Sequence, residues 1–250
     1  MKSSSNEGKV PNSSISRWLL IFGLTFAFLH IMPVFLKTNI RNQLLSGDLL
    51  DFFTPFVIVF VVYKIFSTIK SNLTDSSKNQ AAKLILIFAS TLFVNGHGMH
   101  LSANAIARHL VGMETTAIFR LDYLFDEILG HIFWDSGVVG LSVGIILLSS
   151  KLRPTPNSPA TTAMIIAGAI FYGFTYFCNA VEGQTVVFTL PCAAAITGGI
   201  PILAKSKGLK PTTNPVLSFY LVGYSVSLAL FIYWGLRNGG FPQFSELGWI

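Results

Sequence analysis

Seven long and nearly continuous apolar segments are the feature that most restricts what this chain can fold into. A helix needs about 20 mostly apolar residues to cross the hydrocarbon core of a bilayer. These segments are too long and continuous for the alternating strands of a barrel. In lipid, an α-helix satisfies all its backbone hydrogen bonds within the segment, so we expect each segment to be a helix. The sequence therefore predicts an all-α, polytopic integral membrane protein, a seven-transmembrane-helix bundle. The predicted spans are residues 18–36, 52–69, 84–107, 128–148, 163–181, 186–203 and 216–236.

Composition excludes the main alternatives to a membrane bundle. Hydrophobic residues make up 52% of the 250-residue chain, and charged residues make up only 11%. Soluble domains carry roughly 25% charged residues, so an ordinary soluble domain, a disordered chain and a nucleic-acid-binding protein are excluded. The two cysteines lie in apolar stretches and fit neither a disulfide framework nor a zinc ribbon. We expect no nucleic-acid partner.

The distribution of charge predicts the orientation in the membrane. If the spans alternate in direction, twelve of the 17 lysines and arginines fall on the side of the N-terminus. Cytoplasmic loops carry the excess of basic residues, so we expect a cytoplasmic N-terminus and a C-terminus outside, in a plasma or inner membrane. Nine of the 11 acidic residues and all five histidines fall in or beyond the outer half. We therefore expect the functional site to lie there.

The domain organisation follows from the same pattern. Residues 1–14 are rich in Ser and Asn and are predicted to form a disordered N-terminal tail. Residues 15–250 are predicted to form a single seven-helix transmembrane domain. The loop at 37–51 is expected to carry a short interfacial helix. Three aromatic residues near the C-terminus are expected to rest at the outer interface: Phe241, Phe244 and Trp249.

The third span carries a polar stripe. Residues three or four positions apart share one face of a helix, so two imidazoles, an amide and a guanidinium are expected to line up. Gly96 and Gly98 lie beside this stripe and permit a neighbouring helix or a ligand to approach closely. The members of the stripe are His97, His100, Asn104 and Arg108.

The fourth span carries a second stripe, formed by Glu127, His131 and Asp135, which are spaced four apart. On an α-helix, Asp126 is expected to point about 100° away from Glu127, where it still flanks the same cavity. Consecutive helices joined by a modest loop are usually neighbours, so we expect the two polar faces to meet. Three further polar residues fall at a similar depth in other spans: His30, Asn179 and Glu182.

Ionisable groups inside a membrane cost about 2.5–3.5 kcal/mol each at a helix centre, so a cluster of them requires pairing, hydration or a bound cation. Histidine combined with carboxylate suits Zn²⁺ or Fe. Glu127 or Asp135 is the expected general base towards a metal-bound water. The expected contacts to substrate are Asn104, Arg108 and Asn179. The predicted metal ligands are His97, His100, His131, Asp126 and Glu182.

Each of these residues also has a structural interpretation. The histidines could form hydrogen bonds between helices, and acidic residues such as Asp126 are favoured in the first turn of a helix by its dipole. Arg108 could extend its guanidinium to the outer surface. These alternatives remain open at the level of the sequence.

A histidine near the end of one span and an aspartate at the start of the next, here His97 or His100 and Asp126, resemble the pattern of the CREST hydrolases. This seven-span superfamily includes the alkaline ceramidases. The resemblance is confined to a small part of the chain, because the last span has no His-x-x-x-His pair and no residue matches the family's serine. It implies metal-dependent hydrolysis of a lipid.

The functional prediction is a metal-dependent membrane enzyme that acts on a lipid or another apolar substrate from the outer half of the bilayer, by hydrolysis with metal-activated water. A di-iron membrane oxidoreductase, a proton-coupled transporter and an accessory membrane subunit are alternatives, because intramembrane His, Asp and Glu also serve these functions. A haem bound between His97 and His131 is a further alternative.

Overall fold

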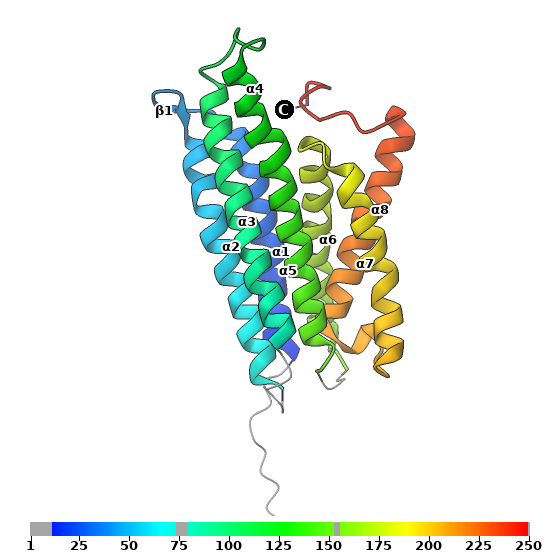
Figure 1. The fold of residues 1–250 in the computed structure, drawn as a ribbon. Helices are drawn as coiled ribbons and strands as arrows, with labels where there is room; N and C mark the ends of the chain where they lie inside the picture. Colours follow the sequence, from blue (N-terminus) through cyan, green and yellow to red (C-terminus); the bar gives the residue numbers. More distant parts are fainter. Residues whose placement is uncertain (1–11, 74–79, 153–155, 250) are drawn as a thin grey trace, which may run out of the picture.

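A computed structural model describes residues 12–73, 80–152 and 156–249. Most of the expected N-terminal tail, residues 1–11, lies outside the described residues. Residues 12–14, which we expected in that tail, belong to the first helix. The described chain forms an all-α bundle. The first described residues lie at one end of the bundle, and the C-terminus lies at the other (Figure 1).

Seven helices of the described chain are long and apolar enough to cross a membrane. Six of them are single α-helices, and the fourth is composite, since α4 (Ala117–Tyr123), η2 (Leu124–Gly130) and α5 (His131–Ser149) follow one another without a break. The others are α1 (Asn12–Phe35), α2 (Ser46–Ser71), α3 (Gln80–Ala107), α6 (Pro159–Glu182), α7 (Val186–Ser206) and α8 (Pro215–Asn238).

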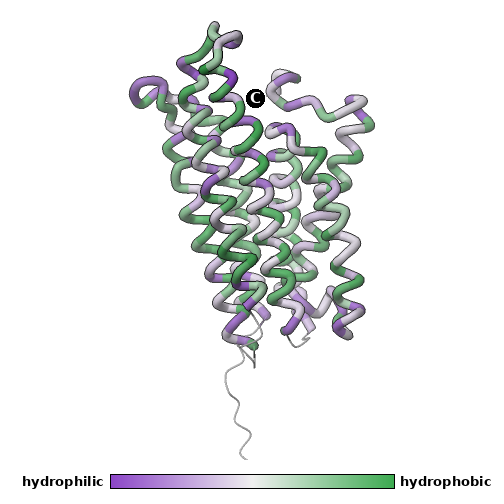
Figure 2. The backbone as a smooth tube through the Cα atoms, viewed as in Figure 1, coloured by the Kyte–Doolittle hydropathy of each residue, from purple (hydrophilic) through white to green (hydrophobic). Residues whose placement is uncertain are grey.

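The outward surface of the bundle supports a multi-pass membrane protein. Large apolar side chains such as Phe56, Phe88 and Ile202 are more than half exposed, and hydrophobic residues cover the length of the helices between more polar ends (Figure 2). A soluble protein rarely exposes apolar patches of this size, whereas lipid solvates them. The predicted membrane class is confirmed at this level.

The connection between α1 and α2 differs from the expected interfacial helix at 37–51. It forms a small hairpin in which β1 (Asn39–Arg41) pairs antiparallel with β2 (Leu44–Leu45). Asn42 and Gln43 in the turn have φ values of 50° and 62°, and two successive left-handed residues favour a tight hairpin over a helix. The expectation of a helix there was wrong, and α2 begins directly after β2.

Small residues set the closest helix crossings. A Cβ atom on Gly23 of α1 would lie 2.0 Å from the carbonyl oxygen of Gly168 on α6, and one on Gly173 would lie 2.1 Å from that of Gly223 on α8. A Cβ on Gly96 of α3 would lie 2.3 Å from the backbone nitrogen of Trp134. Close backbone approach of this kind is the usual basis of helix packing in membranes. The predicted close approach is confirmed at Gly96 but not at Gly98, where a Cβ would meet no described atom within 4 Å.

The remaining described elements are a short 3₁₀-helix, η3 (Pro211–Thr213), and the C-terminal segment, residues 239–249. Gly239 ends α8 with a φ of 65°, a left-handed conformation that glycine adopts without strain. The chain then turns back over the end of the bundle, where it lies across from the hairpin (Figure 1). These two segments flank the candidate site.

Candidate metal centre

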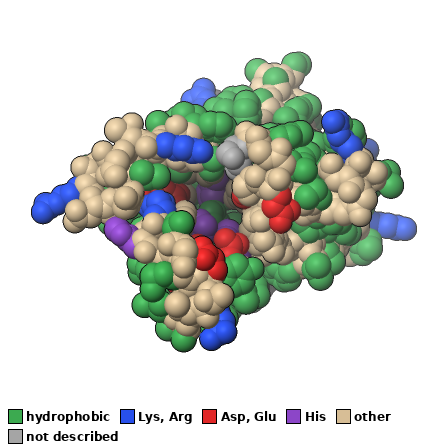
Figure 3. All heavy atoms as spheres, turned by 90° about the horizontal axis from the view of Figure 1, so that it is seen from above, with side chains coloured by type: hydrophobic (Ala, Val, Ile, Leu, Met, Phe, Trp, Pro, Cys, Tyr) green, Lys and Arg blue, Asp and Glu red, His purple; other side chains and the backbone are tan. Residues whose placement is uncertain are grey.

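A cavity of about 990 Å³ opens at the end of the bundle that carries the hairpin and the C-terminal segment. Seen from that end, histidine and acidic side chains gather around a central hollow (Figure 3). The lining is chemically divided. The histidines come from α1, α3 and the fourth span, and all the carboxylates but Glu182 of α6 come from α2 and the fourth span, whereas apolar side chains come from α1, α6, α8 and the C-terminal segment. We call it the central cavity.

Three of the predicted ligands converge on the central cavity. His100, Asp126 and His131 each offer one ligand atom, and these atoms all lie within 4.8 Å of one another. The Nδ1 atom of His100 lies 2.6 Å from Oδ1 of Asp126. A tetrahedral zinc ion with ligand bonds near 2.0–2.1 Å holds its ligand atoms roughly 3.3 Å apart, so small side-chain rotations would complete such a site. The donor set, two imidazoles and a carboxylate, suits zinc or iron.

A π-helix explains how Asp126 and His131 meet. Residues five apart on an α-helix point about 140° away from each other, so an α-helix would separate Asp126 from His131. The structure forms a π-helix over Leu124–Gly130, whose wider i→i+5 turn brings residues five apart into register. Single π-helical turns occur frequently at functional sites, and this one turns Asp126 towards His100.

Glu127 lies beside the three-residue group. Its Oε2 atom is 3.9 Å from Nε2 of His131. The same oxygen is buried and has no hydrogen-bond partner among the described residues. Burying a carboxylate oxygen without a hydrogen-bond partner costs free energy. Such a group is tolerated where it interacts with a bound ligand. The predicted position of Glu127 near the ligands agrees with this geometry.

His97 lies deeper and has a different partner. Its Nε2 atom is 3.2 Å from Oδ1 of Asp51 and 3.0 Å from the Asp51 carbonyl oxygen. Both oxygens are acceptors, so Nε2 carries a hydrogen, and the buried Nδ1 has no hydrogen-bond partner among the described residues. The structure therefore places His97 outside the three-residue group, in a pair with an aspartate at the start of α2.

The indole of Trp134 occupies the middle of the histidines. Its ring centroid lies 4.7 Å from that of His97, 5.3 Å from that of His100 and 5.7 Å from that of His131. It also lies 5.2 Å from the ring of His30. His30 donates through Nδ1 to the Phe26 carbonyl oxygen at 2.7 Å. The indole therefore contacts both the upper histidines, His100 and His131, and the lower ones, His30 and His97.

The structure places Asp135 away from the central cavity. It is 4% exposed and accepts a short hydrogen bond from the hydroxyl of Thr185 at the start of α7. It is absent from the lining of the cavity. Of the two predicted bases, Glu127 is thus the one beside the ligand group.

The predicted substrate contacts all line the central cavity, but Arg108 is already paired. Asn104, Arg108 and Asn179 belong to its lining. The guanidinium of Arg108 donates to the carboxylate of Asp48, and its Nε donates to the carbonyl oxygen of Gln43 at 3.1 Å. Arg108 therefore connects α3 to α2 and to the hairpin.

Glu182 binds the C-terminal segment. Its Oε2 atom accepts hydrogen bonds from the backbone N–H of Phe244 at 2.8 Å and of Ser245 at 3.4 Å. Its Oε1 atom accepts from the hydroxyl of Ser245. Although it was predicted as a metal ligand, its carboxylate lies outside the three-residue group and is engaged by the chain that covers one side of the cavity.

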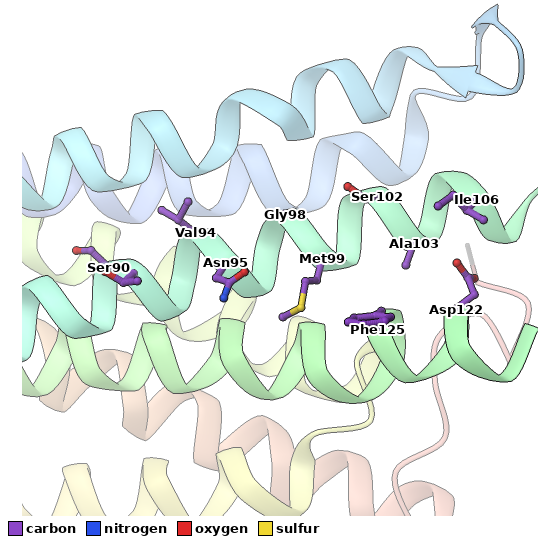
Figure 4. Close-up of a pocket in the computed structure, with 11 residues that line it drawn as sticks. Ser90, Val94, Asn95, Gly98, Met99, Ser102, Ala103, Ile106, Asp122 and Phe125 are labelled. Atoms are coloured by element: carbon purple, nitrogen blue, oxygen red, sulfur yellow. The ribbon is translucent and has the colours of Figure 1, made fainter. Parts of the chain in front are cut away.

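A second hollow, of about 770 Å³, lies between α3 and the α4–η2 segment. Its lining contains Asn95, Gly98 and Met99 from α3 and Asp122 and Phe125 from the fourth span (Figure 4). These α3 positions lie on the opposite side of the helix from His97 and His100, as 3.6 residues per turn requires. The described lining contains no histidine, so this groove is separate from the candidate centre.

Sequence reasoning missed three features of the site. Asp51 stands at the start of a span among polar loop residues, and nothing in its spacing connects it to His97. Trp134 looked like one aromatic residue among many. The π-helix has no simple composition signal, although the crowding of Asp126 and Glu127 before His131 is consistent with a functional turn.

Comparison with known proteins gave no guidance on identity. No family model, no curated protein and no solved structure matches this chain.

Proposed function

We propose that this protein is a metal-dependent membrane hydrolase whose catalytic metal, Zn²⁺ in the first instance, binds to His100, Asp126 and His131. The observation that carries the proposal is the convergence of these three ligand atoms within 4.8 Å in a cavity that also holds Glu127. Three protein ligands with an open fourth position are the usual arrangement of catalytic zinc.

Glu127 is the proposed general base. When bound, the metal supplies an activated water and polarises the scissile bond of the substrate. Glu127 stands next to His131 and has a buried oxygen without a partner, which is the position required of a group that removes a proton from such a water. Asn104 and Asn179 are proposed to orient the substrate by hydrogen bonds from their amides.

The proposed substrate is a lipid or another apolar molecule that enters the central cavity from the bilayer. Phe174, Phe177 and Leu230 line the cavity together with the polar site. Binding sites that combine an apolar wall with a few convergent polar groups are typical of apolar ligands. The expected orientation puts this cavity in the outer half of the membrane.

An iron-dependent oxidoreductase is the second candidate, because two histidines and one carboxylate also form the facial triad of non-haem iron enzymes. A di-iron site would require further bridging carboxylates beside the group. Glu127 is the one within reach of His131, whereas Asp51 is paired with His97. We place zinc first because a site for one metal ion beside a carboxylate general base is the arrangement required for hydrolysis.

The remaining alternatives fit the geometry less well. A haem between His97 and His131 would have to occupy the space of Trp134, whose ring contacts both imidazoles. A proton-coupled carrier requires polar groups along the whole path. The hydroxyls of Ser142, Tyr172 and Tyr224 lie deeper, but they are bonded to one another in a closed ring.

Hydrolysis of a lipid panel tests the proposal. The zinc-loaded protein, incubated with ester and N-acyl lipids, is expected to release fatty acid from at least one class. Glu127→Gln should bind zinc normally and lose about 10²–10⁴-fold of the rate, the range that general-base catalysis contributes. The matched control, Glu114→Gln, changes a glutamate in the loop before α4 and should keep full activity. Zinc-loaded wild type without activity on any of these lipids, or Glu127→Gln with the wild-type rate, would contradict the proposal.

A further inference from the structure

The C-terminal segment contributes a wall of the central cavity. Four of its residues, Gln243, Phe244, Ser245 and Trp249, belong to the lining. The ring centroid of Trp249 lies 5.2 Å from that of Trp234 on α8, and the ring of Phe244 lies 4.8 Å from that of Trp234. The segment therefore supplies part of the apolar lining of the cavity.

One carboxylate fixes this wall to the bundle. Glu182, the last residue of α6, accepts hydrogen bonds from two successive backbone N–H groups and one hydroxyl of the segment. The Gln243 side chain also donates to the Glu182 backbone carbonyl. The second attachment is the Trp234 indole N–H, which donates to the Pro242 carbonyl oxygen at 3.1 Å. Hydrogen bonds to a charged group are the stronger kind, so Glu182 is the main attachment.

The other contacts of the wall with the bundle are between aromatic rings, including those of Phe244 with Phe177 and of Phe241 with Phe231. Ser245 and the residues that follow it to Trp249 are exposed, and the segment contains no regular helix or strand. Segments with few buried contacts open locally at low cost. If Glu182 released the segment, the aromatic wall formed by Phe177, Trp234, Phe244 and Trp249 would lose two of its four members.

From these observations we infer that the space between α6, α8 and the C-terminal segment is a binding subsite for a long hydrocarbon chain, and that Glu182 is its positioning residue. The polar end of the ligand then lies near His100 and His131, and the chain lies against Trp234, Phe244 and Trp249. This inference deepens the proposed function, since it concerns the same cavity and names the part of the substrate held there.

The subsite can be tested without metal or catalysis. In nanodiscs of phosphatidylcholine, a brominated long-chain alcohol quenches any tryptophan that it contacts. We expect a saturable component of quenching that is displaced by the unlabelled long-chain alcohol and not by a short one. This component should decrease in Trp249→Phe and stay unchanged in Trp18→Phe, since Trp18 lies towards the opposite end of the bundle on α1. Quenching that rises in proportion to the probe in all three proteins would overturn the inference.

Glu182→Gln tests the positioning role. Loss of charged acceptor bonds should weaken the saturable binding roughly tenfold, and Glu182→Asp, which retains the carboxylate, should recover part of it. If Glu182→Gln does not fold, Ser245→Ala removes one of the same bonds and should weaken binding in the same direction. Unchanged binding in the folded variants would refute the role of Glu182.

The outcome is separable from that of the proposed function. Saturable alcohol binding that persists in His100→Ala/His131→Ala supports the chain subsite whether or not those histidines bind metal. Absence of saturable binding in a wild-type protein that does hydrolyse lipid would reject the subsite and leave the hydrolase proposal standing.

Discussion

Arg108 shows how the structure changes the interpretation of a single residue. From the sequence it was a candidate for binding a substrate or for reaching the outer surface, and the two could not be separated because its partner is distant in the chain. In the structure it donates to Asp48, which is 8% exposed. A charged pair that is largely removed from water behaves asymmetrically, because loss of one partner leaves the other charge uncompensated.

This asymmetry gives a prediction about stability. Arg108→Met should destabilise the protein by about 3–5 kcal/mol if the pair behaves as fully buried, and by less in proportion to the exposure of the guanidinium. The double variant Arg108→Met/Asp48→Asn should recover much of the loss. The thermal unfolding midpoint in one detergent measures both. A double variant less stable than the single one would show that the pair is not the reason for the loss.

The histidines illustrate what can be predicted from residue type and spacing. Helical periodicity placed His97, His100 and His131 on facing stripes, and the structure does bring all three rings around Trp134. Periodicity could not decide which of them share a ligand site, because that depends on hydrogen-bond partners such as Asp51 that come from other helices. Ligation by His97 stays a prediction from the sequence.

At the scale of elements, the composite fourth span has the largest consequence for the site. Its end was predictable from hydropathy, but the helix begins at Ala117, well before the predicted start at residue 128. Its internal geometry was not predictable either, because a π-helical turn leaves the apolar pattern intact. The candidate site depends on that turn, since an α-helix would direct Asp126 about 140° away from His131. Helix existence is therefore well predicted from sequence here, and side-chain register within the helix is not.

Two single-residue deletions test the role of the π-helix. Phe125 and Ile128 are both 42% exposed, so loss of either side chain costs little packing. Deleting Ile128 shortens the spacing of Asp126 and His131 to four residues, which share a face in an α-helix, and zinc binding should persist. Deleting Phe125 leaves them five apart in a segment that reverts to α-helix, and zinc binding should fall at least tenfold. Equal zinc affinity in the two deletions, measured by competition with a chelating dye, would argue against this register effect.

The short elements were the least predictable. Residues 37–51 had a composition compatible with an interfacial helix, but the left-handed Asn42 and Gln43 make a hairpin instead. The aromatic residues of the C-terminal segment were expected to rest at the membrane interface. In the structure Phe244 and Trp249 pack on Trp234 of α8. No local sequence pattern predicts this contact between the C-terminal segment and the helix.

At the scale of the whole molecule, the seven-helix architecture was the most predictable property, because the bilayer imposes length and apolarity on each span. The predicted orientation rests on the bias of basic residues, and the true orientation decides from which side the central cavity is reached. The hairpin, which contains Gln43, and the C-terminal segment, which contains Glu246, lie at one end of the bundle, and α6, which follows Asn157, begins at the other end (Figure 1).

Cysteine labelling measures this orientation. In a background with Cys178 and Cys192 replaced by Ser, Gln43→Cys and Glu246→Cys should react with a membrane-impermeant maleimide added to intact cells. Asn157→Cys should react only after the membrane is opened. The reverse pattern would place the central cavity on the cytoplasmic side and would contradict the predicted orientation.

The metal content of the purified protein is the most direct test of the central claim. Wild type, His100→Ala/His131→Ala and His109→Ala are purified in parallel without chelators, and zinc and iron are quantified by mass spectrometry alongside a visible spectrum. His109 is exposed in the loop after α3, so its variant controls for loss of a histidine outside the site. We predict near-stoichiometric zinc in wild type and His109→Ala and its loss in the double variant. Metal retained in full by His100→Ala/His131→Ala, or absent from all three proteins, would contradict a metal centre at His100, Asp126 and His131.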